Sequence, residues 1–204
     1  LFGRYVGADV ARRAVTEAGA LTGEVRDAAV LFVDLVGSTQ LAQTRSPAEV
    51  AGVLNTFFQT VVAAVDERQG LINKFQGDAV LAVFGAPLPS ADAACDALAT
   101  ARALSVSLRR LPLVDFGIGV SAGRVFAGNI GAEHRYEYTV IGDPVNEAAR
   151  LADKAKDTPG RALCSDDALV RAGEAERAQW RPQTSEVLRG RLTPTRISAP
   201  SAGA

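Results

Sequence analysis

The sequence has almost none of the residues that usually bind zinc or form covalent cross-links. Its 204 residues include one histidine, two cysteines and no methionine. A single histidine, His134, argues against a zinc site. Cys95 and Cys164 lie far apart and form no CxxC pair, so we expect reduced core thiols of the kind found in cytosolic proteins. These absences argue against a zinc-dependent or disulfide-stabilised protein.

The sequence also lacks an excess of charge of one sign and a long hydrophobic run. With 22 basic and 23 acidic residues the net charge is -1, so we expect no nucleic-acid partner. No apolar run approaches the length of a membrane span, and we expect no signal peptide. A hydrophobic content of 48% suits one compact domain. Because the chain begins at Leu1 rather than Met, we expect it to be part of a longer protein.

What the sequence does contain is a pair of aspartates, each next to an apolar strand. The unbroken apolar run 28–33 is followed by Asp34, and the runs 71–76 and 79–84 are separated only by Gly77-Asp78. Two such residues between strands predict a tight hairpin. Beside the first strand, this hairpin would bring both carboxylates to one edge of a sheet, where they suit Mg²⁺ or Mn²⁺. A helix cap and a turn former are the alternative interpretations, and the pairing favours a metal site.

Helix and strand signals alternate along the rest of the chain. Ser46-Pro47-Ala48-Glu49 reads as a capping box with proline at the first helical position. Further helices are predicted over 90–108 and 143–154. Strands are predicted over 116–130, with a break near Gly123 or Gly128, over 136–141 and 161–164, and at the sheet edge within 180–197. This order predicts an α+β fold with a ferredoxin-like antiparallel sheet core (βαββαβ) and flanking helices.

The two ends of the chain read as appendages to one domain. Within residues 1–27, Val6, Val10 and Ala14 have roughly helical spacing. This helix would either pack on the core or connect the domain to an upstream segment. Residues 198–204 have nothing to bury, and we expect them to be disordered. The domain itself is assigned to residues 28–197.

Three segments of the chain together resemble the signature segments of the class III nucleotide cyclases. They are VLFVDLVGST, NKFQGDAVLAVFG and YEYTVIGDPVNEAARL, and three matches in order are more specific than any one motif. The resemblance covers roughly residues 25–197 and is strongest to bacterial adenylyl cyclases that follow membrane and HAMP segments. It implies the class III cyclase fold, synthesis of a cyclic nucleotide for intracellular signalling, and a cytoplasmic domain of a membrane-associated parent protein with an upstream regulatory region.

The aspartates and the turn after the first of them would then form a metal and phosphate site. Asp34 and Asp78 would hold two divalent cations, Mg²⁺ or Mn²⁺, with the backbone carbonyl of Leu35 as a further ligand. The turn Gly37-Ser38-Thr39 leads into a helix whose first N–H groups can bind phosphate. Plain helix capping explains the same turn equally well, so its position directly after Asp34 is what favours phosphate binding.

Lys74 and Thr139 are the predicted base-reading residues. Lys74 lies four residues before Asp78, on the same strand face but roughly 13 Å away. This separation favours a contact at the far end of a nucleotide, and a solvated lysine is the alternative. The resemblance places Lys74 where adenylyl cyclases donate to adenine N1, and Thr139 where a hydroxyl accepts from the adenine amino group. Guanylyl cyclases usually carry glutamate in place of this lysine, so ATP is the expected substrate.

Asn146 and Arg150 share one face of the helix predicted over 143–154, because they are four residues apart. On an anonymous helix they would be a surface asparagine and a salt-bridged arginine. The resemblance assigns Asn146 to orienting the ribose and Arg150 to stabilising charge on the pentavalent phosphate. It also assigns Arg135, or its neighbour His134, to the terminal phosphates, for which an arginine near 189 or 191 is another candidate.

In the family, each active site combines residues of two protomers, so the resemblance implies a symmetric homodimer with two composite sites. We therefore expect an adenylyl cyclase that converts ATP to 3′,5′-cyclic AMP and pyrophosphate. A guanylyl cyclase is one alternative, and a nucleotide-binding regulatory module without turnover is another. None of the six key positions is substituted: Asp34, Lys74, Asp78, Thr139, Asn146 and Arg150. A cyclic-dinucleotide synthase is disfavoured, because the hairpin does not read GG[DE]EF.

Overall fold

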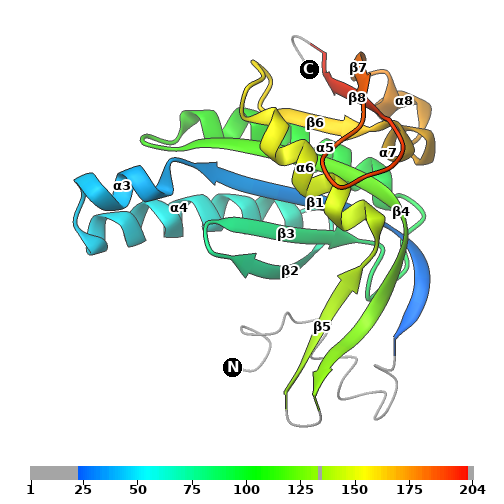
Figure 1. Cartoon of the computed structure of the whole chain (residues 1–204), viewed down its shortest axis with the longest axis horizontal. Helices are drawn as coiled ribbons and strands as arrows, with labels where there is room; N and C mark the ends of the chain where they lie inside the picture. The colour runs from blue at the N-terminus through cyan, green and yellow to red at the C-terminus, as the bar shows by residue number, and fades with distance from the viewer. Residues whose placement is uncertain (1–22, 133–134, 202–204) are drawn as a thin grey trace.

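The structure, a computed structural model, describes residues 23–132 and 135–201, whose strands form one sheet (Figure 1). The strands are β1 (Glu24–Val36), β2 (Leu71–Gln76), β3 (Ala79–Phe84), β4 (Asp115–Ala132), β5 (Arg135–Ile141), β6 (Ala162–Ser165), β7 (Trp180–Glu186) and β8 (Thr195–Pro200). The helices are α3 (Ser38–Thr44), α4 (Pro47–Asp66), α5 (Ala93–Ser107), the short 3₁₀ helix η1 (Leu108–Arg110), α6 (Asp143–Ala155), α7 (Asp166–Arg171) and α8 (Glu174–Arg177).

Strands β2, β3, β1 and β4 lie side by side in that order and form the ferredoxin-like core. β1 pairs antiparallel with β3 on one side and with β4 on the other, and β2 and β3 form the predicted hairpin. β1 is therefore a central strand with both edges paired. Five of the six residues in its run 28–33 are buried, which accounts for the unbroken apolar run. The predicted α+β fold class is confirmed.

Helices α4 and α5 cover one face of this core. Phe57 and Val61 of α4 and Leu98 of α5 are fully buried and belong to one cluster with Leu31 and Val33 of β1. Alternate β1 residues point the other way. The even-numbered residues of β1, Asp34 among them, therefore face the opposite side of the sheet.

Helix α4 begins behind the predicted capping box. The Ser46 hydroxyl accepts from the Glu49 N–H, and the Glu49 carboxylate accepts from the Ser46 N–H. By length and mean hydropathy, this 20-residue helix would also pass as a membrane span, contrary to the expectation that no segment approaches one. Its buried residues, Phe57, Val61 and Val65, pack toward the sheet, and 22% of the apolar window is buried.

Helix α6 covers the opposite face of the sheet. Gly117 and Gly119 of β4 allow it to pack closely. Ala148 of α6 is buried with Val30 of β1 and Leu81 of β3. A Cβ atom at Gly119 would lie 2.0 Å from the carbonyl oxygen of Ala148. The helix backbone therefore rests directly on the strand, and any side chain at this position would push α6 away from the sheet.

We expect Gly119→Ala to destabilise the domain because a methyl group there meets helix backbone rather than a flexible side chain. Overpacking of this kind costs about 1–3 kcal/mol, which corresponds to a fall in melting temperature of roughly 5 °C for a domain of this size. A thermal melt followed by circular dichroism measures it. Gly52→Ala is the matched control, since Gly52 is exposed on α4 with nothing near its Cβ position, and it should melt at the same or a higher temperature. Equal melting temperatures for Gly119→Ala and the unaltered protein would contradict this packing.

Strand β4 runs without interruption over 18 residues, so the predicted break near Gly123 or Gly128 is wrong. Gly128 permits a close backbone crossing instead, because a Cβ atom there would lie 2.3 Å from the Cα atom of Gly23. The outer part of β4 pairs with β5 from Phe126 onward, and Figure 1 shows this hairpin projecting away from the sheet.

The remaining strands extend the sheet beyond β4. β6 pairs parallel with β4, β8 pairs with β6, and β7 forms the edge, as predicted for residues 180–197. β8 continues to Pro200 and Ser198 is buried, so the expectation of disorder is wrong for residues 198–200. The helix predicted within residues 1–27 falls mostly outside the described residues, and residues 24–27 belong to β1.

Candidate active site

Asp34 and Asp78 lie at the same edge of the sheet. Asp34 is opposite Ala79 in the β1–β3 pairing, which places it beside the β2–β3 turn that contains Asp78. The Leu35 N–H donates to the backbone carbonyl of Asp78 at 3.4 Å. The sequence predicts this juxtaposition, and its physical cause is the antiparallel pairing of a strand with the hairpin beside it.

Each of these two carboxylates already has a polar partner within the chain. The Ser38 hydroxyl donates to Asp78 Oδ2 at 2.5 Å, and the Lys156 ammonium donates to Asp34 Oδ2 at 2.6 Å. Lys156 directly follows α6 and also contacts Asp153 at 3.3 Å. Partial burial lowers the pKa of Lys156, but hydrogen bonds and attraction from Asp34 and Asp153 outweigh it and raise the pKa above its ordinary value. The lysine is therefore a fixed positive charge beside Asp34.

Sequence reasoning missed Lys156. Gly117 lies opposite Asp34 in the β1–β4 pairing, and a Cβ atom there would meet Lys156 Cγ at 2.8 Å. Because Gly117 has no side chain, it leaves space for the Lys156 side chain to pass over β4 and reach Asp34. No local pattern signals this contact, because its two residues are 122 positions apart.

The oxygen atoms at this edge fit divalent cations of the Mg²⁺ or Mn²⁺ class. Asp34 pairs with the Lys156 ammonium at 2.6 Å, so its carboxylate faces a positive charge in this structure. Among the described residues, no group of three or more acidic, histidine or cysteine side chains that could hold a metal is present. Asp34 and Asp78 therefore stay the predicted charged ligands at this edge. Mg²⁺ is commonly held by one or two carboxylates together with substrate phosphates. The Leu35 carbonyl stays a predicted ligand.

The turn after β1 has the predicted form. Gly37 has a left-handed backbone with φ of 75° and precedes α3, whose first residue is Ser38. The Ser38 hydroxyl is directed to Asp78 and makes no cap bond to the helix. Ser38 therefore links the helix start to the second aspartate, and the phosphate-binding role of Gly37, Ser38 and Thr39 stays a prediction.

The predicted base-reading residues Lys74 and Thr139 lie together on β2 and β5. Lys74 Nζ is 3.0 Å from Glu137 Oε2, and the Thr139 hydroxyl donates to Asn73 Oδ1 at 3.0 Å. Thr139 is buried, with 7% of its surface exposed. Figure 1 shows β5 well separated from the junction of β1 and α3. Thr139 and the metal pair therefore lie in different parts of the chain, whereas Lys74 precedes Asp78 on the β2–β3 hairpin.

Arg150 lines an open groove beside α6 with a volume of about 670 Å³. Val36 at the end of β1 borders the same groove, as do the cations Lys154, Lys156, Arg161 and Arg189. Asn146, one turn before Arg150, is exposed. Asp115, Asp153, Asp157 and Glu186 line the groove as well, so its charge is mixed. The phosphate role of Arg189 stays a prediction, and the side chain of Arg135 lies outside the described part of the structure.

Arg191 is engaged within the chain and does not fit the phosphate role suggested for it. Its guanidinium pairs with Asp143 at 2.5 Å and also contacts Glu147 and Thr195. Asp143, the first residue of α6, therefore anchors the loop that carries Arg191. The N-cap of α6 is Gly142, and no side chain caps the helix.

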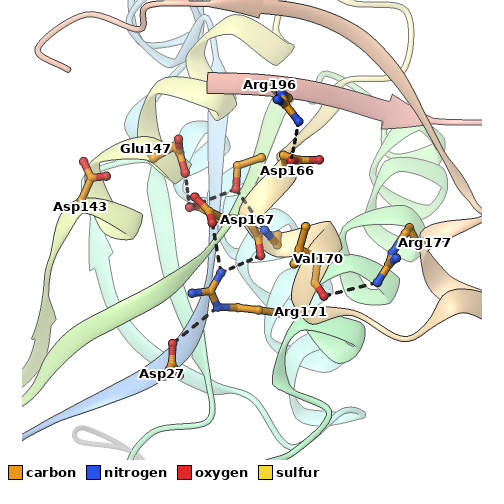
Figure 2. A network of polar contacts seen from close by, with 12 residues as sticks. Asp27, Asp143, Glu147, Asp166, Asp167, Val170, Arg171, Arg177 and Arg196 are labelled. Carbon is orange, nitrogen blue, oxygen red and sulfur yellow. Dashed lines mark hydrogen bonds and ion pairs between the residues drawn. The ribbon is translucent and has the colours of Figure 1, made fainter. Parts of the chain in front are cut away.

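Glu147 is a buried member of this polar network, and Figure 2 shows it above Arg171. Its carboxylate accepts from the Ser121 hydroxyl at 2.5 Å and from the Thr195 hydroxyl at 2.7 Å. Below it in Figure 2, Arg171 of α7 pairs with Asp167 and with Asp27 of β1. The helix that carries Asn146 and Arg150 is therefore fixed to β4 and to the loop before β8.

A ferredoxin-like sheet with two aspartates at one edge and an Asn-Arg helix beside it defines the class III nucleotide cyclase domains. The profile of the family described as "Adenylate and Guanylate cyclase catalytic domain" matches residues 22–181. The chain belongs to this family. That membership confirms the recognised resemblance and establishes a nucleotide cyclase catalytic domain.

Relatives and solved structures of this family cover nearly the whole chain. Uncharacterized protein Rv1319c of Mycobacterium tuberculosis is 52% identical over 98% of this chain, which spans 38% of that protein's length. The crystal structure of the guanylyl cyclase Cya2 has 30% identity and a TM-score of 0.78, covering 87% of this chain and 93% of that one. The adenylyl cyclase CyaB from P. aeruginosa shares the fold, with 22% identity, a TM-score of 0.78 and coverage of 89% and 97%.

Proposed function

We propose that the domain is an adenylyl cyclase, which converts ATP to 3′,5′-cyclic AMP and pyrophosphate. The observation that carries this proposal is that Lys74 and Thr139 both lie where β2 meets β5, through the contacts of Lys74 with Glu137 and of Thr139 with Asn73. An ammonium donor beside a hydroxyl acceptor complements N1 and the amino group of adenine. Guanine presents a donor and an acceptor at the same two positions, so it would meet like groups.

The reaction joins the ribose 3′-oxygen to the α-phosphorus atom and breaks the bond from that phosphorus to the pyrophosphate oxygen. The 3′-hydroxyl proton must leave, and charge on the phosphates must be neutralised. Asp34 and Asp78 would hold two divalent cations, which when bound lower the pKa of the hydroxyl and neutralise phosphate charge. A cation bound at Asp34 would compete with the Lys156 ion pair, and Lys156 lines the same groove as Arg150.

Asn146 and Arg150 would act on the reacting part of the nucleotide. The carboxamide of Asn146 is exposed on α6 and can orient the ribose. The guanidinium of Arg150 keeps its charge and has donors in a fixed plane, which suits the oxygen atoms of a pentavalent phosphate. The buried Glu147 network fixes the helix that carries both side chains, so little reorganisation is needed during the reaction.

We further propose that the active site forms between two copies of the chain. Asp34 lies near the β1–α3 junction and Asp78 in the adjacent β2–β3 turn, whereas Thr139 of the base-reading pair lies on the separate β5 arm (Figure 1). A two-fold dimer would supply both halves to each of two sites. Because the chain spans only about 38% of the length of Rv1319c, we propose that it is the cytoplasmic catalytic part of a longer, membrane-associated protein with an upstream regulatory region.

A guanylyl cyclase is the second candidate function, favoured by the 30% identity to the guanylyl cyclase Cya2. Lys74 is the residue that opposes it, because an ammonium in place of a carboxylate acceptor does not match the guanine donors. A regulatory module without turnover is opposed by the presence of all six predicted site residues.

Changing the base-reading residues tests the proposal. We expect Lys74→Glu combined with Thr139→Asn to lower kcat/KM for ATP and to shift the preference toward GTP by about tenfold or more, because two hydrogen-bond polarities are reversed. Rates with both nucleotides, measured by product chromatography, give this ratio. Lys74→Gln removes the ammonium without placing a second carboxylate beside Glu137, so it isolates the loss of the donor. Arg181→Glu, on the exposed face of β7, controls for charge reversal as such. An unchanged ATP-to-GTP ratio in the folded double variant would remove both residues from the base pocket.

A further inference from the structure

Strand β2 contains a bulge at Asn73, directly before the base-reading lysine. Its pairing with β3 passes from Ile72 opposite Ala82 to Lys74 opposite Leu81, which leaves Asn73 without a partner in the register. Consecutive side chains of a regular strand point to opposite faces, whereas a bulge redirects one of them. Accordingly Asn73 and Lys74 both contact β5, through Thr139 and Glu137 respectively.

The contacts of Asn73 fix which end of its carboxamide faces Thr139. Asn73 Nδ2 donates to the backbone carbonyl of Tyr138 at 2.9 Å. That carbonyl can only accept, so the amide nitrogen must face it and the amide oxygen must face the Thr139 hydroxyl. Because Asn73 Oδ1 has no hydrogen, Thr139 is the donor of the 3.0 Å bond between them.

This bond uses the single hydrogen of the Thr139 hydroxyl. With its hydrogen committed to Asn73, Thr139 Oγ1 presents only lone pairs to any other group. The threonine side chain is buried, so turning the hydroxyl would leave the Asn73 oxygen without its donor in a place with little water to replace it. A threonine that can by nature donate or accept is thereby restricted to accepting.

We propose that Asn73 is a positioning residue that makes Thr139 an obligatory acceptor and so selects the adenine amino group over the guanine carbonyl oxygen. The inference rests on the proposed function and names the source of its specificity. Lys74, held by Glu137, supplies the complementary donor. Asn73 does not touch the base in this account, and it acts only through the hydroxyl of Thr139.

A double-mutant cycle on the ATP-to-GTP ratio of kcat/KM tests this role. Asn73→Leu keeps the approximate size of the side chain but removes both hydrogen bonds, so the freed hydroxyl can turn and donate to guanine O6. We expect the ratio to fall about tenfold, the effect of one ordinary hydrogen bond, mainly because GTP use rises. Thr139→Val removes the hydroxyl, and in that background Asn73→Leu should leave the ratio unchanged.

Competing explanations give different results in the same cycle. A purely structural role for Asn73 would lower the rates with ATP and GTP together and keep their ratio, which would overturn the proposal. An equal fall of the ratio in the Thr139→Val background would also overturn it, because Asn73 would then act independently of the hydroxyl. Asn73→Ala, which adds no bulk at the bulge, replaces the leucine variant if that one fails to fold. Failure of the proposed function is distinguishable, since the unaltered protein would then form no cyclic AMP.

Discussion

Asp34→Asn and Asp78→Asn should each lower kcat by at least about 1000-fold while the domain stays folded. The two carboxylates meet at one sheet edge, and asparagine keeps their shape but removes the negative charge that holds a cation. Stabilisation of transition-state charge by bound metal ions is worth several kcal/mol, and about 4 kcal/mol corresponds to a factor near 1000. Cyclic nucleotide formation with Mn²⁺ measures the rate, and Mn²⁺ binding followed by electron paramagnetic resonance should weaken in parallel.

Two further variants separate metal binding from other effects of these substitutions. Asp92→Asn removes one carboxylate at the exposed start of α5, and it should retain activity. Lys156→Gln breaks the ion pair with Asp34 from the other side, and it leaves the carboxylate in place. A loss in Lys156→Gln as large as that in Asp34→Asn would mean that the ion pair, rather than cation binding, accounts for the effect.

Mixing two inactive variants should restore roughly a quarter of the original activity. One variant carries Asp34→Ala, and the other carries Asn146→Ala with Arg150→Ala, so each homodimer has two damaged sites. In a mixed dimer, one site receives the intact aspartates of one chain and the intact Asn146 and Arg150 of the other. Random pairing makes about half of the dimers mixed, and each has one intact site of two.

This experiment depends on subunit exchange, which is measured separately. The variants are mixed at several protein concentrations, mixed dimers are quantified by native mass spectrometry with an isotope-labelled chain, and product formation is followed with time. Activity should rise in proportion to the mixed dimer. If mixed dimers form and activity stays at the level of the parents, Asp34 acts with Asn146 and Arg150 of its own chain, and the composite site is ruled out.

The local features of the fold were predictable because their causes lie close together in the sequence. The capping box of α4 needs only Ser46 and Glu49, and the β2–β3 hairpin follows from two apolar runs around Gly77-Asp78. The meeting of Asp34 and Asp78 follows from that hairpin and one strand. Glycines in β4 were misread as a break, because close packing against a backbone and a turn require the same residue type.

The unpredicted features are contacts between residues far apart in the chain. Lys156 reaches Asp34 across 122 positions, and the Glu147 carboxylate collects Ser121 and Thr195 from different elements. Asn73 is informative only because a bulge turns it toward Thr139, 66 positions away. Such pairs leave no periodic pattern in a single sequence, and the final packing decides them. They determine which cation stands beside Asp34 and which way the Thr139 hydroxyl points.

Incubation of the purified protein with equal concentrations of ATP and GTP in the presence of Mn²⁺ tests the central claim most directly. Both products are separated and identified by chromatography and mass spectrometry, with the Asp34→Asn protein as the blank. The account predicts 3′,5′-cyclic AMP and pyrophosphate in equal amounts, with cyclic AMP exceeding cyclic GMP by at least about tenfold. Cyclic GMP as the main product, or no cyclic nucleotide from folded dimeric protein, would contradict it.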